Sequence, residues 1–169
     1  MYAAHFAAGL AIKSHSPAAP TWALLTGAFV PDILWIALAT LGVEPTQRNV
    51  FFDDWSHSLA TTLLWATLFA AIFWRRGRPV VAAVWLAVAS HFLLDLPIHP
   101  QDLALYPHSA IHLGLGLSNV TKQTYWWAQL GVLAVLAAVY VQGARRQRVP
   151  GNLIAATCVV LATLHLLMR

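Results

Sequence analysis

The chain has 169 residues, of which 59% are hydrophobic and only 9% are charged, and its net charge is +4. Because about a quarter of the residues in an ordinary soluble domain are charged, this composition excludes such a domain and predicts a protein that lies in lipid. The basic residues are not interleaved with aromatic residues along a polar face, so a nucleic-acid partner is not expected.

The first segment, MYAAHFAAGLAI, is apolar but does not have the pattern of a cleaved secretory signal. No basic residue precedes its apolar run, and His5 interrupts the run itself. We therefore expect a retained membrane helix that is too short to cross alone and packs among the longer helices.

Five longer apolar runs follow, and about 20 residues of helix suffice to cross a hydrocarbon core of about 30 Å. Some runs are shorter, and we expect tilt or burial of their polar ends to make up the difference. The sequence therefore predicts an all-α fold: a polytopic membrane helix bundle of five spanning helices plus the short N-terminal membrane helix, in one integral membrane domain over residues 1–169. The expected spanning helices are Thr21–Leu41, Ser58–Trp74, Pro79–Ile98, Trp126–Gln142 and Leu153–Met168.

Two clusters of arginines predict the orientation of this bundle. RRGR at 75–78 follows the second long run, and RRQR at 145–148 follows the fourth. Short basic loops face the cytoplasm under the positive-inside rule. We therefore expect Lys13 and both clusters inside, and the loops Gly42–His57 and His99–Tyr125 outside.

The strongest local signal for chemistry is SHFLLD, residues 90–95, near the outer end of one expected helix. His91 and Asp95 are four residues apart, so they project from one face of a helix and can bind one ion or two neighbouring ions. A charge well inside a bilayer costs about 2.5–3.5 kcal/mol on insertion scales, and therefore indicates a functional interior site. The alternative is a neutral, protonated carboxyl group bonded to a neighbouring helix.

Three further potential ligands share this depth in the expected bundle. Asp32 follows Pro31, which loosens the helix and can turn the carboxylate inward. His57 stands at a helix start, and His5 lies near the outer N-terminus. Nitrogen and oxygen ligands together suit zinc, manganese or iron, whereas Cys158, the only cysteine, can form neither a disulfide nor a thiolate site. The predicted metal ligands are His5, Asp32, His57, His91 and Asp95.

A hydrolytic centre of this kind also needs a group that accepts the proton of a bound water. Asp54 and Asp102 are the predicted catalytic residues for this role, although Asp53 or Asp54 could instead orient His57. His165 has no acidic neighbour in its apolar run and is expected to be structural. Three histidines of the outer loop are candidates for lining the same pocket: His99, His108 and His112.

Four short motifs in this order carry a resemblance to a known family: HFAAG, GAFVPD, WSHS and SHFLLD. They resemble the bacterial membrane-bound metal-dependent hydrolase family, of the LexA-regulated inner-membrane type. The motifs span residues 5–95, and the number of helices extends the resemblance loosely to the whole chain. WSHS lacks the Arg and Thr of the frequent family form HRGxTHS, which leaves substrate handling at this point open.

The resemblance implies that the same five residues bind a divalent metal. Their order is similar to that in zinc-dependent phospholipase C and the single-strand nucleases, all-helical enzymes that cleave phosphoesters. The implied protein is a multi-pass hydrolase of the bacterial inner membrane that uses zinc, with manganese or iron as alternatives. Its substrate would be a phosphoester or another amphiphile at the outer leaflet, with membrane lipid as its partner.

Two other classes of function fit the same sequence. In one, the chain is a non-catalytic accessory subunit of a larger membrane complex, and its tryptophans pack against other subunits. In the other, two histidines on facing helices bind haem in an electron-transfer protein. Co-purification with other subunits favours the first, and the absence of a Soret band argues against the second.

Overall fold

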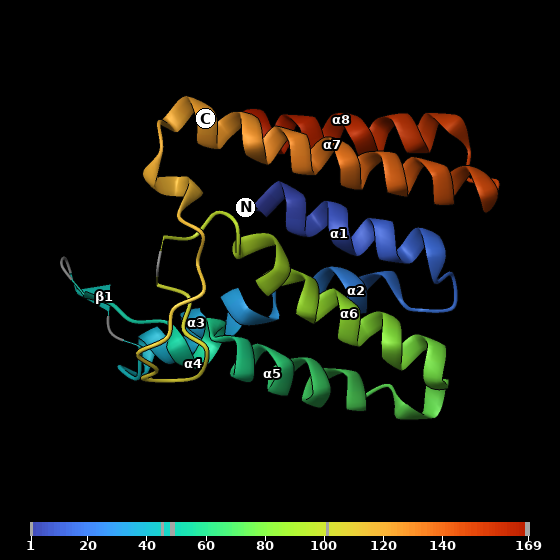
Figure 1. Cartoon of the computed structure of the whole chain (residues 1–169). Helices are drawn as coiled ribbons and strands as arrows, with labels where there is room; N and C mark the ends of the chain where they lie inside the picture. Colours follow the sequence, from blue (N-terminus) through green and yellow to red (C-terminus); the bar gives the residue numbers. More distant parts are fainter. Residues whose placement is uncertain (1, 45, 48–49, 101, 168–169) are drawn as a thin grey trace.

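The computed structural model describes residues 2–44, 46–47, 50–100 and 102–167, and nearly all regular structure within them is helical (Figure 1). The predicted all-α class is confirmed. One hairpin pairs the two-residue strands β1 (Thr46–Gln47) and β2 (Val50–Phe51), and two short 3₁₀ turns are η1 (Trp74–Arg76) and η2 (Leu117–Asn119). The α-helices are α1 (Tyr2–His15), α2 (Thr21–Gly27), α3 (Val30–Thr40), α4 (Asp54–His57), α5 (Leu59–Ala71), α6 (Arg78–Asp95), α7 (Lys122–Arg146) and α8 (Gly151–Leu166).

The number of helices that could span a membrane is smaller than predicted. Within the described residues, α6 with 18 residues and α7 with 25 are long and apolar enough, and the bent pair α2–α3 would make a third. α5 has 13 residues and α8 has 16, which corresponds to about 20 Å and 24 Å of helix against a core of about 30 Å. The prediction of five spanning helices plus a short one is therefore wrong.

The predicted helices were too long where an apolar run continues past the end of its helix. Ile72 and Phe73 belong to the apolar run of α5 but lie in the turn that leads to η1. Hydropathy records that a residue prefers an apolar surrounding, and a residue in a turn can satisfy this preference as Phe73 does, which is buried while Ile72 beside it is exposed. The expected last residue of the final helix, Met168, lies outside the described residues.

The predicted helix Thr21–Leu41 is broken into α2 and α3, which are bent by 55°. Phe29 leaves the helical backbone with φ −117° and ψ 5°, and Pro31 stands in the first turn of α3. Proline has no N–H and its ring clashes with the carbonyl four residues before it, so it does not continue a helix from its N-terminal side. The break leaves the Ala28 carbonyl without its usual helical donor and places Asp32 at the start of a new helix.

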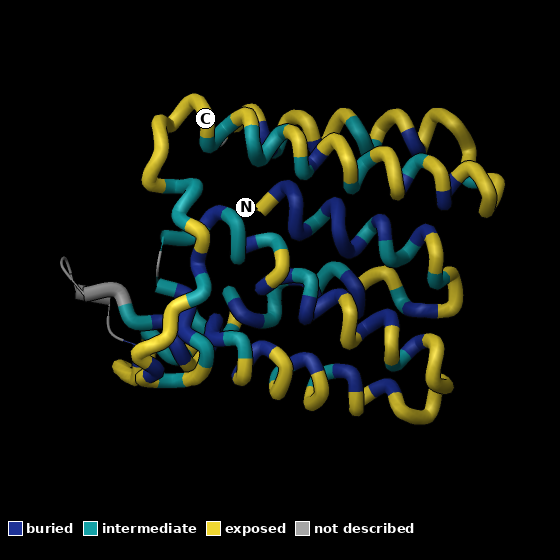
Figure 2. Tube along the Cα trace, in the orientation of Figure 1, coloured by how far each residue is buried: buried dark blue, intermediate teal, exposed yellow. Residues whose placement is uncertain are grey.

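α1 is the central helix of the bundle and is mostly buried (Figure 2). It packs against α2, α6, α7 and α8, and its small residues allow its neighbours to approach closely. At Gly143 of α7, an added Cβ would lie only 2.7 Å from the Cβ and the carbonyl oxygen of Ser14 in α1. The buried residues of α1 are Ala3, Ala4, His5, Ala7, Ala8, Gly9, Ala11 and Ser14.

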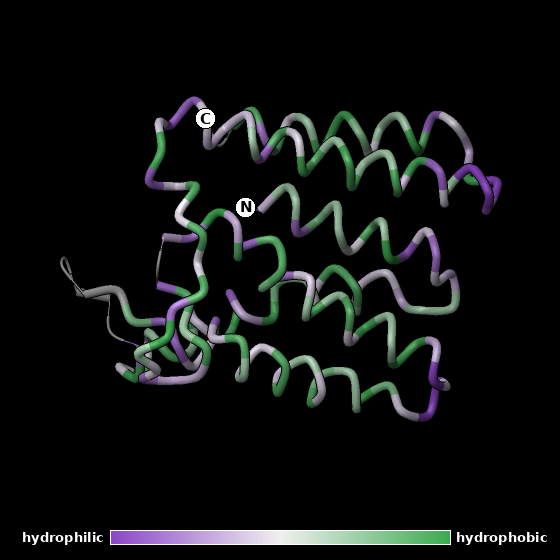
Figure 3. The backbone as a smooth tube through the Cα atoms, in the orientation of Figure 1, coloured by the Kyte–Doolittle hydropathy of each residue, from purple (hydrophilic) through white to green (hydrophobic). Residues whose placement is uncertain are grey.

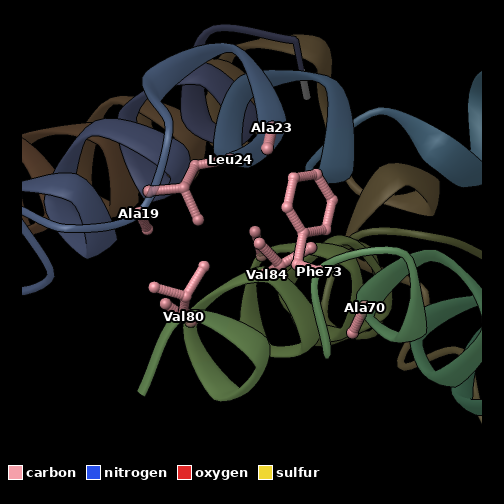
Figure 4. Close-up of a cluster of buried hydrophobic side chains, with 9 residues drawn as sticks. Ala19, Ala23, Leu24, Ala70, Phe73, Val80 and Val84 are labelled. Carbon is pink, nitrogen blue, oxygen red and sulfur yellow. The ribbon is translucent and has the colours of Figure 1, made fainter. Parts of the chain in front are cut away.

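A compact apolar cluster joins α2, α5 and α6 on the other side of α1. In Figure 4, Leu24 of α2 and Val80 and Val84 of α6 lie around one space, and Phe73 contributes its ring from the turn after α5. Leu24 and Val84 are completely inaccessible to solvent. Burying a side chain of this size contributes about 1.5–3 kcal/mol, so the cluster holds α6 against the N-terminal half of the chain.

The outer surfaces of the bundle are apolar as well. Figure 3 shows hydrophobic residues along most of α7 and α8, and many of these residues are exposed in Figure 2. Val135 of α7 and Val159 of α8 are each 64% exposed. An apolar surface of this extent is unusual for a soluble monomer, and it agrees with a membrane as the surrounding of these helices.

The acidic residues and most of the described basic residues lie at opposite ends of the bundle, with Lys122 at the start of α7 as the exception. The α1–α2, α5–α6 and α7–α8 turns lie together at one end (Figure 1), and they carry Lys13 and the two arginine clusters. All six acidic residues belong to segments at the other end, where α3, α4 and the α6–α7 connection meet. We call these the basic end and the acidic end.

The positive-inside rule predicts that the basic end faces the cytoplasm. With Cys158 replaced by Ala, single cysteines at Gly151, at the basic end, and at Ala110, in the α6–α7 connection, can report on the two ends. An impermeant thiol reagent added to intact cells should label A110C, and should label G151C only after the membrane is opened. Labelling of G151C alone from outside would reverse the orientation.

The close approach of α1 and α7 predicts a sharp difference between two glycines of α7. Gly143→Ala should lower the free energy of unfolding by about 1–3 kcal/mol, because the added methyl group overpacks the contact with Ser14. Gly131→Ala meets nothing within 4 Å and should be neutral or stabilise by up to about 1 kcal/mol. Thermal unfolding in detergent measures both, and equal stabilities would contradict this account of the α1–α7 contact.

Candidate metal centre

The acidic end gathers all five predicted metal ligands in one cluster. α1 contributes His5, the first turn of α3 contributes Asp32, α4 ends at His57, and the last turns of α6 carry His91 and Asp95. Two overlapping groups each bring their donor atoms within 4.8 Å of one another: His5, His91 and Asp95, and Asp32, His57 and His91. These buried groups could hold a metal ion.

Asp95 lies between two imidazoles. Its Oδ1 is 3.3 Å from His5 Nε2, and its Oδ2 is 3.0 Å from His91 Nε2. Asp95 is 3% exposed, and the two histidines are each 1% exposed. An ionised carboxylate buried to this degree needs neighbouring positive charge or hydrogen-bond donors, since it has lost its hydration.

Asp32 lies between a second pair of imidazoles. Its Oδ1 is 3.4 Å from His57 Nε2 and 3.7 Å from His91 Nε2. His91 is therefore the residue that joins the two groups, with carboxylates from α3 and from its own helix on either side. The break before Pro31 is what directs the start of α3 toward this point.

The backbone fixes the tautomer of His91. Its Nδ1 lies 2.8 Å from the carbonyl oxygen of Ala28, and because a carbonyl only accepts, Nδ1 must carry the hydrogen. In the neutral ring this leaves a lone pair on Nε2, and this atom has no hydrogen-bond partner of proper geometry among the described residues. A buried nitrogen lone pair that faces two carboxylate oxygens is stable only with a cation, either a metal ion or a proton, between them.

A hydroxyl group fixes the tautomer of His57 in the same way. Ser56 Oγ donates its hydrogen to the Asp53 carbonyl oxygen at 3.0 Å, and it lies 2.7 Å from His57 Nδ1. Having donated its single hydrogen, the hydroxyl accepts from Nδ1–H, so that Nε2 of the neutral ring again presents a lone pair to the cluster. Such partners behind a ligand are typical of metal-binding histidines.

The spacing of the donor atoms suits a metal ion. With bonds of about 2.0–2.2 Å from zinc to nitrogen or oxygen, two ligand atoms of one ion lie about 3.0–3.5 Å apart. The observed separations between imidazole nitrogens and carboxylate oxygens run from 3.0 to 3.7 Å. The donor set is mixed nitrogen and oxygen, which suits zinc, manganese or iron.

A cavity of about 210 Å³ opens beside the cluster. Its wall includes Tyr2, Trp35, Asp53 and His99, together with His5, Asp32, His57 and Asp95 of the cluster. Burial raises the pKa of Asp53 to about 6, and its Oδ2 lies 4.0 Å from His57 Nδ1. The cavity has room for a small polar group directly against the predicted ligands.

His99 and Asp102 form a pair at the edge of the centre. His99, a predicted pocket residue, lines the cavity, and its Nδ1 lies 3.2 Å from Asp102 Oδ1. Burial lowers the pKa of His99, but the hydrogen bond to Asp102 and the nearby Asp95 outweigh this, and the net pKa is raised. Asp102 therefore orients a histidine at the edge of the centre, and its predicted part in proton transfer stays a prediction.

Asp54, the other predicted catalytic residue, has a different contact. Its Oδ2 accepts a hydrogen bond of 2.7 Å from the His108 backbone N–H, and it is not among the described residues that line the cavity. His108 is exposed and stacks on Phe52, and His112 is exposed in the same loop. The structure therefore does not bring these two pocket candidates to the cavity wall.

Glu44 is a structural support of the centre that the sequence did not indicate. It is completely buried, and its Oε1 accepts from the backbone N–H groups of Trp55 at 2.7 Å and Ser56 at 3.0 Å. This carboxylate holds the first turn of α4, whose last residue is His57. Its being the only glutamate of an apolar chain is the one feature that could have drawn attention to it. Its role could not be predicted, because its partners are backbone N–H groups and no sequence pattern indicates them.

Comparison of the chain with protein-family models, curated proteins and solved structures finds no match. What the centre can do therefore follows from its own geometry.

Proposed function

We propose that the protein is a membrane-embedded, metal-dependent hydrolase. The observation that carries this proposal is the convergence of five ligand-type side chains, four of them buried and Asp32 half-buried. Two of them are imidazoles whose Nε2 lone pairs face carboxylate oxygens. Two lone pairs that face carboxylate oxygens would lower stability unless a cation lies between them, so a purely structural network does not explain this arrangement. The resemblance to membrane-bound metal-dependent hydrolases, drawn from the sequence motifs, agrees with this.

In the proposed reaction, different residues of the centre bind the metal, orient its ligands and exchange protons. A bound divalent ion, for which we propose zinc, would lower the pKa of a bound water toward neutrality and polarise a phosphoryl or acyl oxygen. His5, Asp32, His57, His91 and Asp95 would hold the metal, while Ala28 and Ser56 keep two of the rings in the binding tautomer. Asp53 and His99 face the same cavity and are placed to exchange protons with water or substrate there.

The surroundings of the cavity point to an amphiphilic substrate. The centre lies at one end of an apolar bundle, and the aromatic side chains of Tyr2 and Trp35 form part of the cavity wall. We propose a phosphoester or a related amphiphile in the outer leaflet of the bacterial inner membrane, with the basic end of the bundle in the cytoplasm. Membrane lipid is then both the surrounding and the source of substrate.

Removal of a ligand should abolish metal binding and turnover together. Purified wild-type protein reconstituted with zinc or manganese should hydrolyse a phospholipid or a model phosphodiester, and a chelator should stop the reaction. His91→Ala and Asp95→Ala should reduce kcat/KM by at least about 10³-fold, because both contribute to metal binding. His15→Ala, an exposed histidine at the basic end, is the control and should keep its activity.

An accessory subunit would behave differently in the same experiment. It would show no turnover with any metal, and the same substitutions would act by loss of a partner complex. Inert, metal-free and fully folded wild-type protein would contradict the enzyme and leave only the fold.

The serine behind His57 provides a test of metal binding that keeps every ligand in place. Ser56→Ala should weaken metal affinity by about 10- to 100-fold, as expected when the partner that orients a ligand is lost. Ser90→Ala is the matched control, because Ser90 also precedes a ligand histidine but donates to the Ala87 carbonyl oxygen. Competition with a fluorescent chelator measures both affinities, and equal values would contradict the role of Ser56.

A further inference from the structure

His5 and His91 lie face to face at the centre of the cluster. Their ring centroids are 4.0 Å apart and their planes differ by only 8°. Each ring faces its own oxygen of a single carboxylate, since His5 Nε2 lies 3.3 Å from Asp95 Oδ1 and His91 Nε2 lies 3.0 Å from Asp95 Oδ2. The two imidazoles are therefore parallel neighbours that point at different atoms.

Parallel ring planes limit how these two histidines can bind metal. The lone pair of an imidazole nitrogen lies in the ring plane, so an ion bound at about 2.0–2.1 Å lies close to that plane. Parallel planes do not intersect, and one ion between them would lie well out of the plane of both rings. His5 and His91 consequently present their lone pairs to two separate points.

His57 has the opposite relation to His91. Their ring planes differ by 59° and their centroids are 5.2 Å apart, so the planes intersect and both Nε2 atoms can face one point. Asp32 Oδ1 lies within 3.7 Å of both nitrogens. These three residues form a set of three donors for a single ion, and Asp95 Oδ2 lies beside this set at 3.0 Å from His91 Nε2.

We propose that the centre binds two divalent ions, with the carboxylate of Asp95 between them. One ion is held by His57, His91 and Asp32, and the other by His5 and Asp95 Oδ1. The distance of 4.0 Å between the two ring centroids is close to the separation of about 3.5–4 Å between the ions of two-metal hydrolytic sites. This inference rests on the proposed metal-dependent function, and adds a claim about the number of ions and the part of His5.

The two positions differ in the number of protein donors. The first has three, whereas the second has two. Fewer protein donors leave more coordination positions for water or substrate. The ion at His5 therefore binds more weakly and is the one that the cavity can supply with substrate.

Manganese(II) is the probe that separates one ion from two. Full-length protein is purified, stripped with a chelator and titrated with manganese, while elemental analysis counts bound ions and electron paramagnetic resonance reports their surroundings. The first equivalent should give the six-line signal of an isolated ion, and the second should convert it into a spin-coupled multiline signal. His5→Ala should stop at one ion with the six-line signal, and His15→Ala should follow the wild type.

The outcomes of this titration are distinct from those of the activity assay. Saturation at one ion per chain, lost equally in His5→Ala and His91→Ala, would overturn the two-ion centre and leave a metal-dependent hydrolase standing. Absence of bound manganese and zinc at any concentration would overturn both. If His5→Ala does not fold, the wild-type titration decides alone, because the coupled signal requires two ions within a few ångströms.

Discussion

The rest of the acidic end is organised around the burial of one carboxylate. Asp95 is almost inaccessible at the end of α6, in a bundle whose other buried residues are mostly apolar. A charge at this place costs several kcal/mol unless it is paired, and imidazoles from α1 and from its own helix approach it, with His99 further out. α1 and α4 bring His5 and His57 to this carboxylate and to Asp32 of α3. The imidazoles can supply positive charge there by binding a metal ion or a proton.

The position of α1 depends on side-chain size. A helix that carries a ligand through the middle of the bundle must have neighbours on every side, and large side chains would hold them apart. Alanine and glycine on α1, and Gly143 on α7, let the backbones approach. Because α1 contributes little apolar area of its own, larger side chains such as Leu24 of α2 and Phe73 of the turn after α5 supply it in the adjacent cluster.

Much of the candidate site was predictable because its signals are local. The four-residue spacing of His91 and Asp95 determines their common face, and Pro31 correctly indicated a disturbance of the helix before Asp32. The number of spanning helices was not predictable, since hydropathy does not distinguish the apolar turn at Phe73 from another turn of helix. The hydrogen bonds that hold the ligands in place could not be predicted from the sequence either. They involve the Ala28 carbonyl and the N–H groups bound by Glu44, which are backbone atoms that every residue type carries.

The break between α2 and α3 positions both a carboxylate ligand and a backbone carbonyl at the site. It turns Asp32 toward His57, and it leaves the Ala28 carbonyl free to receive the hydrogen of His91 Nδ1. In an unbroken helix, that carbonyl would accept from the Asp32 N–H instead. One proline thus serves a carboxylate on its own helix and an imidazole 60 positions later in the chain.

The order of the ligands along the chain has a consequence for biogenesis. His5, Asp32 and His57 leave the ribosome before His91 and Asp95, and segments synthesised first also begin to fold first. Until α6 is synthesised, α1 and α3 hold ionisable groups without His91, the residue that joins the two ligand groups. On the proposed function, metal binding at the complete centre therefore has to follow the synthesis of α6, which carries the histidine shared by both ligand groups.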